Sequence, residues 1–133
     1  MEEKAGEVFS IAKDNMPVPG CTISKEVHGG ENGIIYFSLA KNTDISAEIF
    51  PYHKLLIVAE GSLEVYGTNG YRKVLHAGDS VLTSTDIPIG MKTDTGAVYT
   101  EIEIRRSDIM NEAIKAGEVF RLAELVPYAE GNL

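Results

Sequence analysis

The stretch of sequence that decides the fold reads Lys54-Leu55-Leu56-Ile57-Val58-Ala59-Glu60-Gly61-Ser62-Leu63-Glu64-Val65-Tyr66. Its first half is apolar on both faces, which is typical of a strand that is covered on both sides. Its second half alternates between apolar and polar residues and predicts a strand with one buried face. Turn residues follow at 67–70, and residues 71–76 complete a predicted hairpin.

Further short strands are predicted on both sides of this hairpin, at residues 33–39, 45–50, 80–83 and 97–104. Turns separate them every eight to twelve residues or so, which is typical of an all-β sandwich or barrel rather than of a parallel α/β sheet. Beyond them, Ser107 and Asp108 predict the start of a short C-terminal helix that ends at Gly117.

Size and charge exclude several classes of protein. The chain has 133 residues, which favours one domain, and a formal net charge of −8. An acidic chain is a poor electrostatic match for nucleic acid or for an anionic membrane. The start of the chain lacks the features of a secretion signal, and the longest apolar run, residues 55–59, is far shorter than the roughly 20 residues of a membrane span. We therefore expect a cytoplasmic protein with neither nucleic acid nor membrane as a partner.

Cysteine chemistry is limited, because Cys21 is the one cysteine of the chain. An internal disulfide and a thiolate metal cluster are both excluded. Its sequence neighbours supply no activating base, so we expect a small buried or half-buried residue rather than a catalytic thiol.

One segment of the sequence occurs twice. Residues 4–9 read Lys-Ala-Gly-Glu-Val-Phe, and residues 115–120 repeat the same six letters. The register continues, since Ala12 matches Ala123 and Gly20 matches Gly131. Two interpretations stay open: a second, truncated copy of the domain begins within residues 115–133, or both segments have equivalent edge roles on one barrel. In either case residues 1–133 are predicted to form a single barrel domain with its core at about 33–105.

Two stretches resemble the sequence motifs of cupins, a family of small jelly-roll β-barrels. Residues 46–67 contain Pro51, the apolar strand, the Glu60-Gly61 turn and the next strand, and residues 77–90 contain Ala77-Gly78-Asp79 and Ile87-Pro88-Ile89-Gly90. The resemblance covers about residues 33–104. It implies an all-β cupin double-stranded β-helix of the small, conserved-barrel type.

The resemblance also implies a homodimer, because cupins commonly dimerise through an apolar outer strand face such as that of residues 55–59. A second sheet, the terminal helix or the chain's own ends are alternative covers for that face.

Metal-binding cupins use two histidines one residue apart, then a carboxylate and a third histidine. Counting from Gly61 and Gly78 places Glu48, Phe50, Lys54 and Ile89 at those positions. One carboxylate beside an ammonium group does not suit iron, manganese or zinc. We therefore expect neither a metal nor another cofactor. A displaced site built from the chain's three histidines stays an alternative, although their wide spacing favours rim positions: His28, His53 and His76.

The alternation of strand residues turns Glu48, Phe50 and Lys54 into the barrel. This predicts an internal Glu48–Lys54 ion pair over an aromatic floor, and a pocket for a small polar or zwitterionic ligand. A salt bridge that merely plugs the barrel and an amine nucleophile at Lys54 are the alternatives. The candidate ligand-binding residues are Glu48, Phe50, Lys54, Ile89, Tyr52 and His53.

Two classes of function fit this pattern. The first is a metal-free, small-molecule-binding protein with an accessory or regulatory role, which the missing metal ligands favour. The second is a metal-independent enzyme that performs isomerase- or epimerase-like acid–base chemistry on a small polar substrate. The enzyme would need a histidine base and a tyrosine acid that face each other across the pocket. We favour the binding protein and assign no catalytic residue.

Overall fold

The structure is a computed structural model that describes residues 5–28, 33–105 and 115–121. Within them the chain forms a short helix and nine strands: α1 (Ile11–Asp14), β1 (Thr22–His28), β2 (Ile34–Leu39), β3 (Thr43–Glu48), β4 (His53–Gly67), β5 (Arg72–His76), β6 (Asp79–Leu82), β7 (Ile89–Thr93), β8 (Ala97–Ile104) and β9 (Val119–Arg121). No helix in the described part of the chain is long and apolar enough to cross a membrane.

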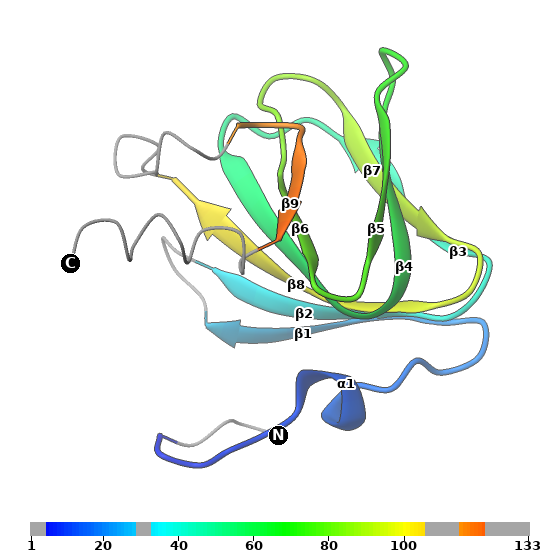
Figure 1. Ribbon diagram of the computed structural model, residues 1–133, viewed down its shortest axis with the longest axis vertical. Coiled ribbons are helices and arrows are strands. Elements are labelled where there is room, and N and C mark those ends of the chain that lie inside the picture. The colour runs from blue at the N-terminus through cyan, green and yellow to red at the C-terminus, as the bar shows by residue number, and fades with distance from the viewer. Residues whose placement is uncertain (1–4, 29–32, 106–114, 122–133) are drawn as a thin grey trace.

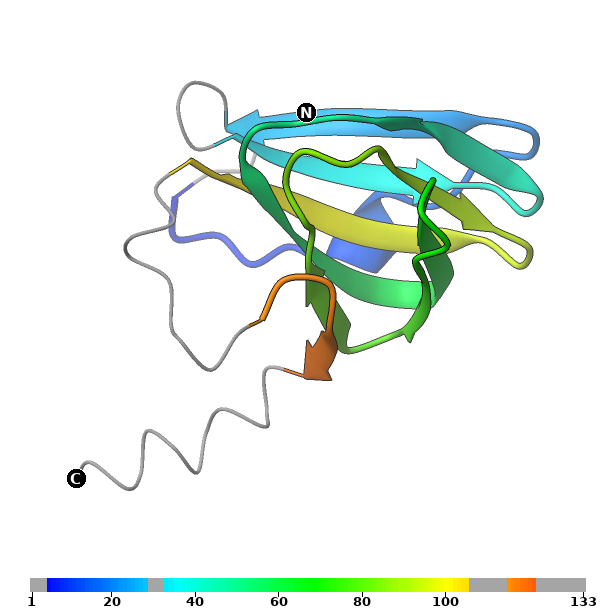
Figure 2. The ribbon, with the colours of Figure 1, turned by 90° about the horizontal axis from the view of Figure 1, so that it is seen from above.

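The strands form two antiparallel sheets that face each other as a barrel (Figures 1 and 2). One sheet has the order β1-β2-β8-β4-β6-β9, and the other joins β3, β7, β4 and β5. β4 belongs to both, because its first half pairs with β8 and β6 and its second half with β7 and β5. This shared strand joins the two sheets into one closed body.

β4 passes from one sheet to the other at a bulge and a glycine. The bulge lies between Val58 and Glu60, and Gly61 follows with a φ of +80°. A Cβ at Gly61 would lie 2.0 Å from the carbonyl oxygen of Gly96, so only glycine fits. The bulge also shifts the inward face from even to odd positions, so the buried residues are Leu56, Val58, Leu63 and Val65.

The hydrophobic core lies between the two sheets. Tyr99 is fully buried there, and its ring stacks on that of Phe37 with centroids 5.1 Å apart. On the outer face of the larger sheet, the ring of Phe9 lies 6.1 Å from that of Tyr36, and the hydroxyl of Ser38 donates to the backbone oxygen of Asn15. The chain's own N-terminal segment therefore covers part of this face, with α1 beneath it (Figure 1).

The predicted strands are present, although some of their bounds differ: the strand predicted at residues 45–50, for example, is β3 (Thr43–Glu48). The two halves of residues 54–66 form one continuous strand, and β8 has the bounds that the alternation predicts. β1, β7, β9 and α1 are elements that the sequence patterns do not predict. The short helix predicted to follow Ser107 lies outside the described residues.

The expectation that Cys21 is buried or half-buried is wrong. Its side chain is exposed, because the residue immediately precedes β1, which pairs with β2 alone and so forms one edge of its sheet.

The two copies of the repeated segment have different structures. Both contain a glycine at nearly the same positive φ, +83° at Gly6 and +85° at Gly117. After Gly117 the chain enters β9 and pairs with β6, whereas residues 5–9 form no strand and Val8 is fully exposed. The segments therefore do not have equivalent edge roles. Residues 122–133, where a second domain copy is expected to continue, lie outside the described residues.

Candidate ligand-binding site

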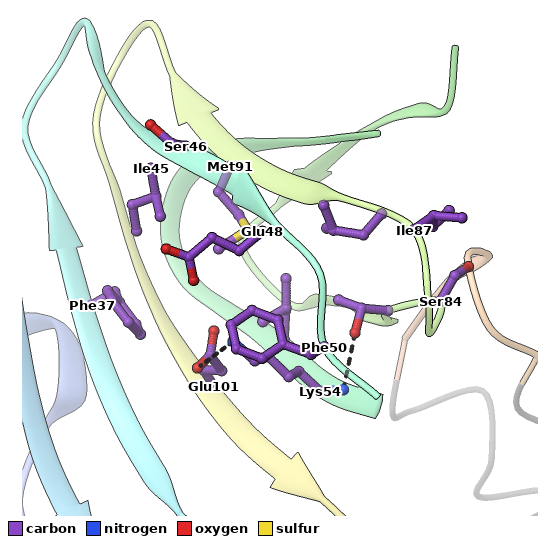
Figure 3. Close-up of a pocket in the computed structure, with 13 residues that line it drawn as sticks. Phe37, Ile45, Ser46, Glu48, Phe50, Lys54, Ser84, Ile87, Met91 and Glu101 are labelled. Atoms are coloured by element: carbon purple, nitrogen blue, oxygen red, sulfur yellow. Dashed lines mark hydrogen bonds and ion pairs between the residues drawn. The ribbon is translucent and has the colours of Figure 1, made fainter. Parts of the chain in front are cut away.

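A cavity of about 120 Å³ lies inside the barrel, between β3, β4, β7 and β8 (Figure 3). Cavities of about 150 Å³ in protein interiors hold a molecule the size of benzene, so there is room here for a small organic ligand. Its walls are mostly apolar, and its lining residues are Phe37, Ile45, Ser46, Glu48, Phe50, Lys54, Leu56, Thr83, Ser84, Ile87, Ile89, Met91 and Glu101.

Four of the six candidate residues from the sequence meet at this cavity. Glu48 comes from the end of β3, Phe50 from the segment after it, Lys54 from the start of β4 and Ile89 from the start of β7. They are far apart in sequence, and the barrel brings them together because β7 pairs with both β3 and β4.

Lys54 is held in place at both its backbone and its side chain. Its backbone N–H donates to Thr83 Oγ1 at 3.0 Å, and the N–H of Thr83 donates to its carbonyl oxygen at 2.9 Å. The ammonium nitrogen lies 3.4 Å from Glu101 Oε2 and 3.4 Å from the centroid of the Phe50 ring. The ammonium group is therefore paired with a carboxylate and also contacts the face of an aromatic ring.

The predicted Glu48–Lys54 ion pair is wrong, because the partner of Lys54 is Glu101. Glu101 pairs in register with Leu56, so its side chain shares the inner face with Lys54. Glu48 lies across the cavity on β3, after a bulge that follows Ile45, and its side chain is exposed. The carboxylate that neutralises the lysine thus comes from the last long strand of the barrel.

Glu101 is a buried carboxylate, with only 4% of its side chain exposed. Burial raises the pKa of Glu101, because the charged form loses its hydration. The ammonium of Lys54 opposes this rise, and the nearby carboxylates of Glu103 and Glu48 add to it. The site therefore holds negative charge that Lys54 compensates only in part.

Tyr52 and His53, the other two candidates, do not line the cavity. The hydroxyl of Tyr52 donates to Glu103 Oε2 at 3.3 Å, and the guanidinium of Arg105 lies 4.0 Å from the centroid of its ring. Nδ1–H of His53 donates to the carbonyl oxygen of Thr83 at 2.7 Å. Both side chains make structural contacts beside the site.

The donor atoms do not fit the metal centre that cupins usually carry. Glu48 and Glu101 are the carboxylates of the cavity, and the described residues contain no group of three or more His, Cys, Asp or Glu side chains placed to hold a metal ion. His76 is 71% exposed and lies near Asp79, and the side chain of His28 lies outside the described residues. The absence of a bound metal stays a prediction.

Glu101 is the important residue that the motif positions do not reveal. The signal for it is indirect: it follows Tyr99 by two residues in an alternating strand, so the two share a face. A large aromatic residue on that face indicates the core, and a carboxylate on the same face is then an inward charge that needs a partner. Thr83, Ser84 and Met91 carry no comparable signal.

Comparison with solved structures identifies the fold. No family model and no curated protein matches the sequence. Among solved structures, a conserved protein of unknown function from Streptococcus pyogenes aligns over 80% of this chain and 94% of its own, with 16% identity and a TM-score of 0.73. A cupin superfamily protein from Desulfitobacterium hafniense aligns over 78% and 95%, with 12% identity and a TM-score of 0.71.

A cupin 2 conserved barrel domain protein from Leptotrichia buccalis is also similar, with 22% identity and a TM-score of 0.66. The match covers 84% of this chain and 49% of that protein, so the chain corresponds to about half of it. At these identities the likeness concerns the fold alone. The chain has the cupin fold, a double-stranded β-helix, as its sequence motifs predict.

Proposed function

We propose that the protein binds a small molecule in the barrel cavity and acts through this binding, in an accessory or regulatory role, rather than through catalysis. The observation that carries the proposal is the cavity itself, which combines apolar walls with a few convergent polar groups. The Lys54–Glu101 pair lies at its wall and leaves its volume open, which argues against a salt bridge that plugs the barrel.

Binding is favoured over acid–base catalysis by the residues that face the cavity. A metal-independent isomerase or epimerase would need a histidine and a tyrosine there, and the described lining residues include neither. Lys54 is engaged by Phe50 and Glu101, which does not favour a free amine nucleophile.

Native mass spectrometry of the purified protein tests the proposal. We expect a small molecule to copurify with the wild-type protein and to be lost in Ile87→Trp, because Ile87 lines the cavity and a tryptophan fills it. Val74→Trp is the matched control, since Val74 is 44% exposed on β5 and away from the cavity. The proposal fails if the wild-type protein carries no small molecule and none from a panel of small polar metabolites raises its melting temperature.

A further inference from the structure

The charged groups that face the cavity are unbalanced. Among the described lining residues, Glu48 and Glu101 are carboxylates and Lys54 is the single cation. A carboxylate only accepts hydrogen bonds, whereas an ammonium group only donates them. Since the ammonium of Lys54 is already engaged by Glu101 and Phe50, the cavity offers mainly acceptors to a ligand.

Both carboxylates have free acceptor capacity. Glu101 contacts Lys54 through Oε2, and its other oxygen forms no hydrogen bond with a described residue. The side chain of Glu48 forms neither a hydrogen bond nor an ion pair within the described part of the chain. Figure 3 shows the two side chains extending from β3 and β8 toward the same part of the cavity. The two are close enough for the charge of Glu48 to raise the pKa of Glu101.

A positive group between these carboxylates would offset their repulsion and form charge-assisted hydrogen bonds. The side chains of Phe37, Ile45 and Met91 line the cavity on the side of these carboxylates (Figure 3), and their apolar surfaces suit an apolar body. We propose, resting on the proposed function, that the ligand is a small organic cation: a primary ammonium group on a short apolar chain.

An anionic ligand fits the same atoms less well. To bind a carboxylate, Lys54 would have to leave Glu101, and that buried acid would then lose its partner. The anion would also face Glu48 across the cavity. The sequence predicts a small polar or zwitterionic ligand, and an ammonium group is the part of such a ligand that this site recognises.

Calorimetric titration with three probes of similar size tests the proposal: n-butylammonium, butan-1-ol and butyrate. Such small ligands reach dissociation constants of about micromolar to millimolar. We expect n-butylammonium to bind at least about tenfold more tightly than butan-1-ol, because it alone carries a positive charge that offsets the repulsion between the two carboxylates. Butyrate should not bind, and Ile87→Trp should abolish the binding of n-butylammonium.

The control addresses the net charge of −8, which attracts any cation. Glu48→Gln and Asp44→Asn each remove one negative charge from β3, but only Glu48 lines the cavity. We expect about tenfold weaker binding of n-butylammonium to Glu48→Gln and unchanged binding to Asp44→Asn. Equal affinities for the two variants would overturn the proposal, since the attraction would then be a property of the whole surface.

The outcomes also separate this proposal from the proposed function. Equal binding of all three probes, lost in Ile87→Trp, would overturn the cationic ligand and support a cavity that binds small molecules. Tighter binding of butyrate than of n-butylammonium would also overturn the cationic ligand and support a cavity that binds small molecules. If no probe binds, the cationic ligand is overturned, and the copurified small molecule in native mass spectra decides the proposed function separately.

Discussion

Lys54 provides the one positive charge among the described residues that line the cavity. Only 12% of its side chain is exposed, and the exposed fraction of Glu101 is 4%. Two charges so far from water are tolerated only together, because each loses hydration that the other replaces. The stability of the barrel interior therefore depends on both members of this ion pair.

Replacing Lys54 should show this dependence. Lys54→Met keeps the aliphatic bulk but leaves Glu101 buried without a partner, and the loss of one partner of a buried pair costs about 3–5 kcal/mol. Lys54→Met with Glu101→Gln should recover much of the loss. Urea unfolding followed by circular dichroism measures the unfolding free energies of the wild type, the two single variants and the double variant, which together form a double-mutant cycle. Glu48→Gln is a control and should lower the unfolding free energy by less than about 1 kcal/mol. Simple additivity of the two substitutions would show that the pair is not coupled.

The pH dependence of stability should carry the signature of Glu101. Burial raises the pKa of this carboxyl above its ordinary 4.5 in the folded state, so the folded protein holds the proton more tightly than the unfolded chain. The contribution of Glu101 to stability is then fully present below pH 4.5 and is lost as the pH rises through the folded pKa.

Urea unfolding of the wild-type protein and of Glu101→Gln across this range provides the measurement. The unfolding free energy of the wild type, minus that of the variant, should fall as the pH rises. A difference that grows with pH would mean that Lys54 lowers the pKa of Glu101 below its ordinary value, contrary to this account.

Among the elements, the repeated six residues show how far local sequence determines structure. The turn at the glycine is the same in both copies, because the local sequence sets it. The structure after the turn depends instead on the neighbouring elements: β9 lies beside the edge of β6, whereas residues 5–9 make no backbone hydrogen bond with a described residue. Sequence could predict the turn, but not which copy becomes a strand.

Other elements show the same division between local and tertiary causes. The alternating pattern of residues 97–104 predicts β8 with both ends correct, since a half-buried strand carries its own signal. β7 contains Gly90 and the exposed Lys92, and its short pattern does not distinguish a strand from a turn. α1 has four residues, too few for helical periodicity to be visible.

The same glycine-to-alanine substitution in the two copies of the repeat measures how much the contacts of the second copy with β6 and Tyr71 contribute to stability. Gly117 donates its N–H to the carbonyl oxygen of Leu82 and accepts from the hydroxyl of Tyr71, whereas a Cβ at Gly6 would meet nothing within 4 Å. Gly117→Ala should lower the unfolding free energy by about 1 kcal/mol or more, because alanine is strained at positive φ and the docked turn cannot relax.

Gly6→Ala is the matched control and should cost under about 0.5 kcal/mol, because its turn is free to rearrange. Both variants can be compared in one series of urea unfolding curves. Equal losses would show that docking of β9 adds nothing to the effect.

At the scale of the whole molecule, closure of the barrel assembles the site. Glu48, Phe50, Lys54 and Ile89 could be placed from the sequence, because motif spacing and strand alternation are local properties. The pairing of Lys54 with Glu101 could not, because it requires the register between β4 and β8. The cavity itself is likewise a property of the packed barrel, since no single strand encodes an unfilled volume.

The homodimer expected from the sequence stays a prediction. The N-terminal segment, which already covers part of the outer sheet face, exposes several apolar side chains that a second copy would cover: Val8, Phe9, Met16 and Val18. Light scattering should give twice the chain mass of 14.5 kDa. Val8→Asp with Met16→Asp should shift the protein toward the monomer, whereas Ile49→Asp, at another exposed residue, should not. A mass of 14.5 kDa at all concentrations would contradict the dimer.

Methyl NMR with isotope-labelled isoleucine and methionine reports directly on whether a small cation binds inside the barrel. Saturating n-butylammonium should shift the methyl signals of the cavity residues Ile45, Ile87, Ile89 and Met91. The exposed residues Ile23 and Ile49, which do not line the cavity, should keep their shifts. Unchanged cavity signals, or shifts confined to Ile23 and Ile49, would contradict the account.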